Sequence, residues 1–107
     1  MALSSDQIDQ AIELFDGVGQ LSYRRMFGGM CLYSDGTVFA LMRSDGTLML
    51  KAVGDFRDRV TREGWVPWHH VRKNGTRTSM PYWEIPESVI DEPDTARALA
   101  TESLAAM

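Results

Sequence analysis

The chain has 107 residues, of which 44% are hydrophobic and 24% are charged, and its formal net charge is −4. This length fits one domain, and no apolar run approaches the roughly 20 residues that a membrane-spanning helix needs. We therefore expect a single globular domain over residues 1–107 that makes no contact with a membrane.

The N-terminus and the cysteine count indicate the compartment. The first residues contain neither a basic region nor an apolar stretch of signal-peptide length. Cys31 is the only cysteine, which excludes an internal disulfide and a zinc site made of cysteines. These features predict a cytoplasmic protein.

Charge is distributed unevenly along the chain. Residues 1–50 carry a net charge of −3, residues 51–77 of +4 and residues 78–107 of −5. Nucleic-acid binders usually have a clearly basic domain, whereas the sequence pI here is about 5.0. Direct nucleic-acid binding is therefore not expected. The basic segment has two interpretations, a solvated face balanced by the acidic C-terminal segment or a contact with an anionic partner.

The first half of the chain predicts a helix followed by four strands. Ser4 and Gln7 have the spacing of a capping box, and apolar residues at helical spacing predict a helix over about 6–16. Short apolar stretches then predict strands over 21–27, 30–33, 38–43 and 48–52. The turn signals Gly28-Gly29, Asp35-Gly36 and Asp45-Gly46 favour tight hairpins, so we expect an antiparallel meander.

A second helix and a second hairpin are predicted next. An amphipathic pattern indicates a helix over 55–63, and strands over 68–72 and 76–83 flank the turn signal Asn74-Gly75. Pro81 falls inside the second of these strands. Because proline has no backbone N–H, we expect this strand to lie at a sheet edge or to be bent.

The last element completes the predicted fold. Asp94 is expected to cap a helix over about 95–106, whose many alanines favour helix. The order is then helix, four-strand meander, helix, two-strand hairpin and helix. It predicts an α+β fold of two layers, in which helices pack on a single antiparallel sheet.

A set of short motifs resembles one known family, the N-terminal domain of TfoX/Sxy proteins. The motifs are Arg25-Met26-Phe27-Gly28-Gly29, Asp35-Gly36, Phe39-Ala40-Leu41, Leu48-Met49-Leu50-Lys51, Pro67-Trp68, Tyr82-Trp83, Pro86 and Asp91-Glu92-Pro93-Asp94. The resemblance covers nearly the whole chain. It implies a two-layer α+β domain with one antiparallel sheet. It also implies a regulatory role, because the family members are regulators linked to competence for DNA uptake.

The resemblance also implies a transcriptional setting. Full-length members act as coactivators with the cyclic-AMP receptor protein and carry a second, helical domain. This chain ends at Met107, after the last predicted helix, so we expect it to act without that second domain.

Seven residues are candidates for an interaction site: Arg24, Arg25, Phe27, Lys51, Trp68, Tyr82 and Trp83. The three cations are expected at the ends of adjacent strands, where they would gather around an anionic group or protect a strand edge from pairing. The aromatic residues either fill the core or form a contact surface, to which the seven methionines could also contribute.

Three further features have plain structural interpretations beside chemical ones. Phe27, in the Met-Phe-Gly-Gly run, is expected in the core rather than presented to a partner, and Cys31 is expected to be a small buried hydrophobe rather than a nucleophile. His69 and His70 are neighbours in a predicted strand. Their side chains would point to opposite faces and would not bind one metal ion together.

No motif in the sequence demands a reaction, a cofactor or a metal. We therefore expect a non-enzymatic regulatory domain that binds a protein, either a transcription regulator or a second copy of itself in a homodimer. The alternative is a small-molecule or anion binder, with a possible enzymatic role, built around Arg24, Arg25, Lys51 and a histidine. A preformed pocket lined by these cations would favour the alternative.

Overall fold

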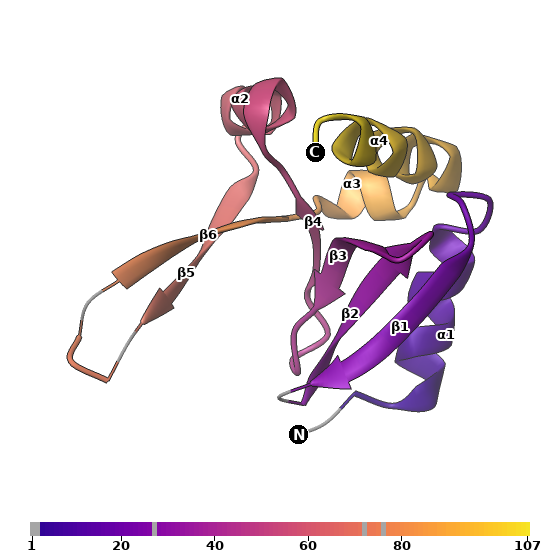
Figure 1. The fold of residues 1–107 in the computed structure, drawn as a ribbon, viewed down its shortest axis with the longest axis horizontal. Coiled ribbons are helices and arrows are strands. Elements are labelled where there is room, and N and C mark those ends of the chain that lie inside the picture. The colour runs from indigo at the N-terminus through magenta and orange to yellow at the C-terminus, as the bar shows by residue number, and fades with distance from the viewer. Residues whose placement is uncertain (1–2, 27, 72, 76) are drawn as a thin grey trace.

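The computed structural model describes residues 3–26, 28–71, 73–75 and 77–107 (Figure 1). Within these residues the elements are α1 (Ser5–Leu14), β1 (Leu21–Met26), β2 (Gly29–Ser34), β3 (Thr37–Met42), β4 (Leu48–Lys51), α2 (Gly54–Arg62), β5 (Val66–Val71), β6 (Arg77–Glu84), α3 (Glu87–Ile90) and α4 (Pro93–Ala105). Their order confirms the predicted one, apart from the short helix α3. No helix in the described part of the chain is long and apolar enough to span a bilayer.

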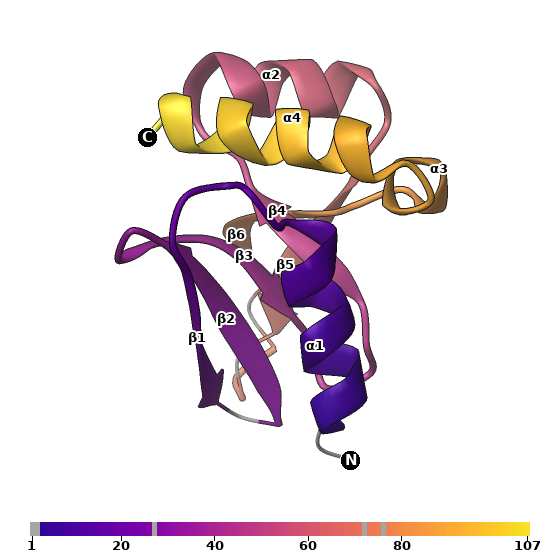
Figure 2. The same ribbon diagram turned by 90° about the vertical axis from the view of Figure 1, so that its right-hand side faces the viewer.

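All six strands belong to one sheet. Its order is β1-β2-β3-β4-β6-β5 and every pairing is antiparallel, which confirms the predicted α+β class. Helix α1 lies against the part of the sheet formed by β1 to β3, and α2 and α4 run side by side beyond the end of that part (Figure 2). The β5–β6 hairpin extends away from the meander (Figure 1).

The helix ends follow local side-chain chemistry. The Ser4 hydroxyl accepts a hydrogen bond from the Gln7 amide, and the Gln7 side chain accepts one from the Ser4 amide, so the predicted capping box is confirmed. The prediction for α4 is wrong by two residues. Glu92 is the N-cap and Pro93 begins the helix, because proline has no N–H to satisfy there, and Asp94 lies in the first turn.

Backbone conformation at the turns explains the meander. Asp35 and Gly36 both have positive φ, as the two central residues of a type I′ hairpin require. Between β3 and β4, the Arg43 amide donates to the Thr47 carbonyl and the Gly46 amide donates back to Arg43. Gly29 is needed for a different reason, since a side chain at this position would lie 2.4 Å from the carbonyl oxygen of Met42.

A bulge between β2 and β3 directs an additional aromatic ring into the core. The register shifts by one residue between Leu32 and Tyr33, so Phe39 has no partner of its own on β2. Phe39 and Ala40, although consecutive, are therefore both buried in the helix-side core. The Phe39 ring meets Phe15 of α1 edge-on, with ring centroids 5.3 Å apart.

The core lies between one face of the sheet and helices α1, α2 and α4. Its larger members are Ile8, Phe15, Met30, Leu32, Phe39, Leu48, Leu50, Phe56, Val60, Trp65, Trp83, Ile85 and Leu99. Helix α2 is held to α4 by charge as well, because Arg59 forms ion pairs with Glu63 and with Glu102. This pairing supports the view that the basic segment is balanced by the acidic C-terminal segment.

Strand β6 differs from its prediction in part. It lies between β4 and β5, so the expectation of an edge strand is wrong for the strand as a whole. The expectation of a bend is confirmed, since the pairing of β5 with β6 shifts between Pro67 and His69. The Ala52 amide donates to the Pro81 carbonyl, and the β4–β6 register ends at Tyr82. Beyond Pro81, towards Arg77, β6 pairs with β5 alone.

Candidate interaction site

The two faces of the sheet have different surroundings. Side chains alternate between faces along each strand, so residues that pair across strands point to the same side. Leu41 pairs with Cys31 and with Met49, and Met49 pairs with Glu84. Leu41 and Met49 are buried, yet neither belongs to the helix-side core. We call the side to which these residues point the open face.

A pocket of about 420 Å³ lies on the open face, where the meander and the β5–β6 hairpin face each other. We call it the open-face groove. Its main side chains are Met26, Cys31, Leu41, Trp68, Met80 and Tyr82, together with Arg43. They come from β1, β2, β3, β5, β6 and the loop after β3, and no helix contributes a lining residue. The groove is therefore a product of the bent sheet.

Sulfur and aromatic groups dominate the chemistry of the groove. The Cys31 thiol donates to the Met26 sulfur at 3.6 Å. Burial raises the pKa of the Cys31 thiol, which keeps it protonated and makes it a poor nucleophile. Cys31 is half-buried, less than the full burial expected from the sequence.

Tyr82 reaches across the open face. Burial is the main cause that raises the pKa of the Tyr82 hydroxyl, and Cys31 and Tyr33 on β2 raise it further. Tyr82 of β6 and Cys31 of β2 line the same pocket although β3 and β4 lie between their strands, so the surface is concave here. The Tyr82 ring therefore forms one wall of the groove and Cys31 the other.

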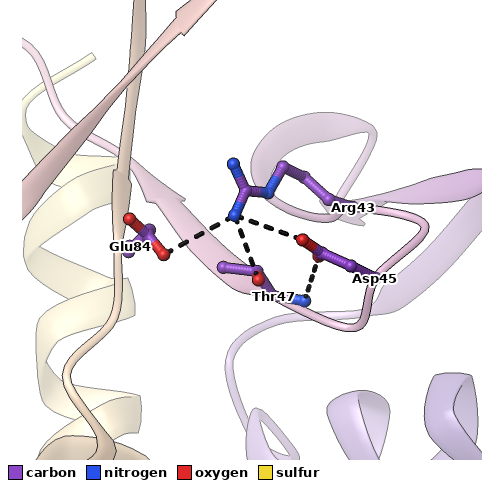
Figure 3. A network of polar contacts seen from close by, with 4 residues as sticks. All are labelled: Arg43, Asp45, Thr47 and Glu84. Carbon is purple, nitrogen blue, oxygen red and sulfur yellow. Dashed lines mark hydrogen bonds and ion pairs between the residues drawn. The ribbon is translucent and has the colours of Figure 1, made fainter.

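Arg43, which lines the groove, also holds a small polar network (Figure 3). Its Nη2 lies 3.6 Å from Glu84, 3.5 Å from Asp45 and 3.1 Å from the Thr47 hydroxyl. The Thr47 amide donates to Asp45 at 2.9 Å, and this bond is the largest cause that lowers the pKa of Asp45. Glu84 and Asp45, the acids of this network, are thus both engaged with Arg43.

The three candidate cations do not gather. Arg24 and Arg25 lie on β1 and Lys51 on β4, with two strands between them, so the expectation of adjacent strands is wrong. Arg25 donates to the Leu3 carbonyl at 2.9 Å and so fastens the N-terminal segment. Arg24 pairs with Cys31 and Lys51 pairs with Tyr82, which places both on the open face beside the groove.

The aromatic candidates also divide between the two faces. Trp83, like Trp65, is buried in the helix-side core, whereas Trp68 and Tyr82 are half-buried in the groove. Phe27 lies outside the described residues. His69 and His70 lie on β5, but their side chains are not among those described.

A second pocket of similar volume lies on the helix side, lined by residues of α1, α3 and α4 among others. Its cation, Arg97, donates to the carbonyl oxygens of Leu14 and Glu13 in the last turn of α1. Arg97 therefore satisfies helix carbonyls that would otherwise lack partners. This pocket is best explained as part of the packing between α1 and α4.

The chemistry of the open-face groove is mainly that of apolar contact. The groove offers apolar contact area, a protonated thiol and a tyrosine with a raised pKa. Within the described residues, no three side chains among His, Cys, Asp and Glu come together as a metal site. Sequence reasoning missed Met26, Leu41, Met80 and Arg43 as site residues. Their only signals were the methionine content and their positions in predicted strands.

Comparisons with known proteins agree with the fold. A family model described as the TfoX N-terminal domain matches residues 13–107. The chain is 32% identical over 88 residues to Protein Sxy of Escherichia coli (strain K12), covering 82% of this chain and 41% of that protein. It is 26% identical over 87 residues to DNA transformation protein TfoX1 of Aliivibrio fischeri (strain ATCC 700601 / ES114), covering 81% and 41%. The chain thus spans about two fifths of the length of the curated relatives it matches.

Proposed function

Because the chain belongs to the TfoX N-terminal domain family, we propose that it is a non-enzymatic regulatory module that binds a protein partner through the open-face groove. The observation that carries the proposal is the groove itself, an apolar concavity built from both parts of the sheet and not covered by any helix. One relative is named a DNA transformation protein, which supports a role in the control of DNA uptake.

The composition of the groove supports a protein as the ligand. Methionine side chains are flexible and adapt to varied partners, and aromatic residues are enriched in the cores of protein interfaces. Met26, at the rim, is exposed on the surface, and Trp68 and Tyr82 are half-buried. These side chains would lose further contact with water when a partner segment enters the groove.

A matched pair of variants tests the proposal. Met26→Glu introduces a charge at the groove, and Tyr23→Glu introduces the same charge at an exposed position of the same strand whose cross-strand partner, Leu32, belongs to the helix-side core. The intact chain and Tyr23→Glu should capture the same protein from native lysate, and Met26→Glu should lose it. Transcript levels in cells that carry each variant should change with Met26→Glu only. Retention of every captured protein by Met26→Glu would refute the proposal.

A small molecule is the second candidate ligand, because a volume of about 420 Å³ lies within the range of small-molecule sites. A small-molecule site built on a cluster of Arg24, Arg25 and Lys51 is not supported, since Arg25 binds the Leu3 carbonyl. Native mass spectrometry of the purified chain would reveal a retained metabolite. Its loss in Met26→Glu would favour this candidate over the protein partner.

A further inference from the structure

The charges around the open-face groove are not balanced within the domain. Arg24 and Lys51 form no ion pair with any described residue, whereas Arg43, Arg57, Arg59 and Arg97 each do. The acids near the groove, Glu84 and Asp45, already contact Arg43. The groove is therefore flanked by two cations that pair with no acid among the described residues, although the whole chain is acidic.

These two cations flank the groove through their strand positions. Arg24 sits opposite Cys31 on β2, and Lys51 sits opposite Tyr82 on β6. Cross-strand partners point to the same face, so each cation stands beside a residue that lines the groove. A segment lying in the groove would thus meet apolar side chains in its middle and positive charge beside them.

A second copy of this chain fits the groove poorly. Two copies meeting groove to groove would bring Arg24 and Lys51 of both copies together without a compensating acid. A groove that instead met the acidic C-terminal region of another copy would form a head-to-tail contact, which gives rings or open filaments rather than closed dimers. Charge complementarity therefore favours a different protein.

We propose that the open-face groove binds a segment of another protein in which apolar side chains are flanked by aspartate or glutamate. The inference rests on the proposed function and adds the chemistry of the partner. The apolar side chains would pack against Met26, Leu41, Trp68 and Tyr82, and the flanking carboxylates would meet Arg24 and Lys51. Charges at the rim of an interface mainly set specificity and association rate, so the acids would select among apolar segments.

The test uses a phage-displayed library of random peptides of about 12 residues, which span roughly 40 Å when extended. Peptides are selected on the full chain and counter-selected on Met26→Glu. The expected peptides carry Asp or Glu beside apolar residues. Their affinity for the double variant Arg24→Glu/Lys51→Glu should fall about tenfold or more, and added salt should weaken binding to the original chain.

The matched control is Arg62→Glu, which is compared with the single variants Arg24→Glu and Lys51→Glu because each of the three changes the net charge by the same amount. Arg62 is exposed on α2, away from the groove, and forms no ion pair with a described residue. Circular dichroism and melting temperature confirm that each variant is folded. Arg62→Glu should bind the peptides like the original chain, which separates the local effect of Arg24 and Lys51 from the effect of net charge.

The outcomes distinguish this inference from the proposed function. Two results would overturn the inference of an acidic partner while leaving the groove as a binding surface. In the first, the Met26-dependent peptides are neutral or basic; in the second, they bind Arg24→Glu/Lys51→Glu as well as the original chain. A library with no Met26-dependent peptide would count against both. A dimer in light scattering that Met26→Glu dissociates would also overturn the inference, because the groove would then be a self-interface.

Discussion

Arg43 and Glu84 form an ion pair across β4, with Nη2 and Oε1 3.6 Å apart, and so connect the meander to the β5–β6 hairpin. Both side chains are about one-third exposed. A pair in such a setting contributes modestly to stability. Its importance lies in its place, because Arg43 also lines the open-face groove.

Removal of the Glu84 charge should have a small and salt-dependent effect. Glu84→Gln is expected to lower the free energy of unfolding by about 0.5 kcal/mol, since Arg43 keeps Asp45 and Thr47 as partners. Urea denaturation measures the change, and the difference should shrink in high salt. Glu87→Gln is the control, because Glu87 is an exposed acid that forms no ion pair with a described residue. A loss above 3 kcal/mol would show that Arg43 depends on Glu84 alone.

Gly29→Ala should destabilise the sheet by about 1–3 kcal/mol, because the new methyl group would lie 2.4 Å from the Met42 carbonyl oxygen and backbone would have to move. Gly17→Ala provides the comparison. Gly17 has positive φ and open space around it, so its substitution costs backbone strain of about 1 kcal/mol only. Equal melting temperatures of Gly29→Ala and the original chain would contradict the close packing of β2 on β3.

Ser103 fastens α4 to β4, since its buried hydroxyl donates to the Lys51 carbonyl. Ser103→Ala should lower the free energy of unfolding by about 1 kcal/mol through the lost hydrogen bond. Ser88→Ala is the control. It replaces an exposed helical serine and so corrects for the higher helix propensity of alanine. If the two substitutions had the same effect in urea denaturation, the bond would contribute nothing to stability.

Alkaline pH should weaken the fold through Cys31 and Tyr82. Their ordinary pKa values are 9.0 and 10.0, and burial raises both in the folded state. The unfolded chain therefore releases these protons first, and the folded state binds more protons above pH 9. Stability from this source is complete below pH 9 and is lost as pH rises through the raised pKa values.

The double variant Cys31→Ala/Tyr82→Phe isolates this contribution. It removes both titrating groups, so its unfolding free energy should fall less steeply between about pH 8 and 10.5 than that of the original chain. Urea denaturation at each pH gives the two slopes. Parallel slopes would mean that neither group titrates differently in the folded state.

Local signals predicted most elements of this fold. Asp35 and Gly36 specify a hairpin because aspartate tolerates positive φ and glycine, which has no Cβ, adopts it freely, and the capping box at Ser4 specifies a helix start. Both act over a few residues, which a sequence displays directly. Helix α3 escaped prediction because four residues give too short a pattern to show a helical period.

The site depended on relationships that the sequence does not display. The faces of Trp68 and Trp83 follow from the register shift in the β5–β6 hairpin, and the pairing of β6 with β4 spans about thirty residues. The sequence identifies Arg24 and Lys51 as candidates. The expectation that they cluster with Arg25 assumed that their strands are adjacent, which they are not in the sheet. Which candidates share a surface is therefore decided by tertiary pairing.

Thiol footprinting tests the central claim that the open-face groove is the binding surface. Cys31 is the only cysteine in the chain and lines the groove, so iodoacetamide labelling followed by mass spectrometry reports on this position alone. A saturating partner, either the captured protein or a selected peptide, should slow the labelling of Cys31 in the original chain and equally in Tyr23→Glu. An unchanged labelling rate with the partner bound would place the interface elsewhere and contradict the account.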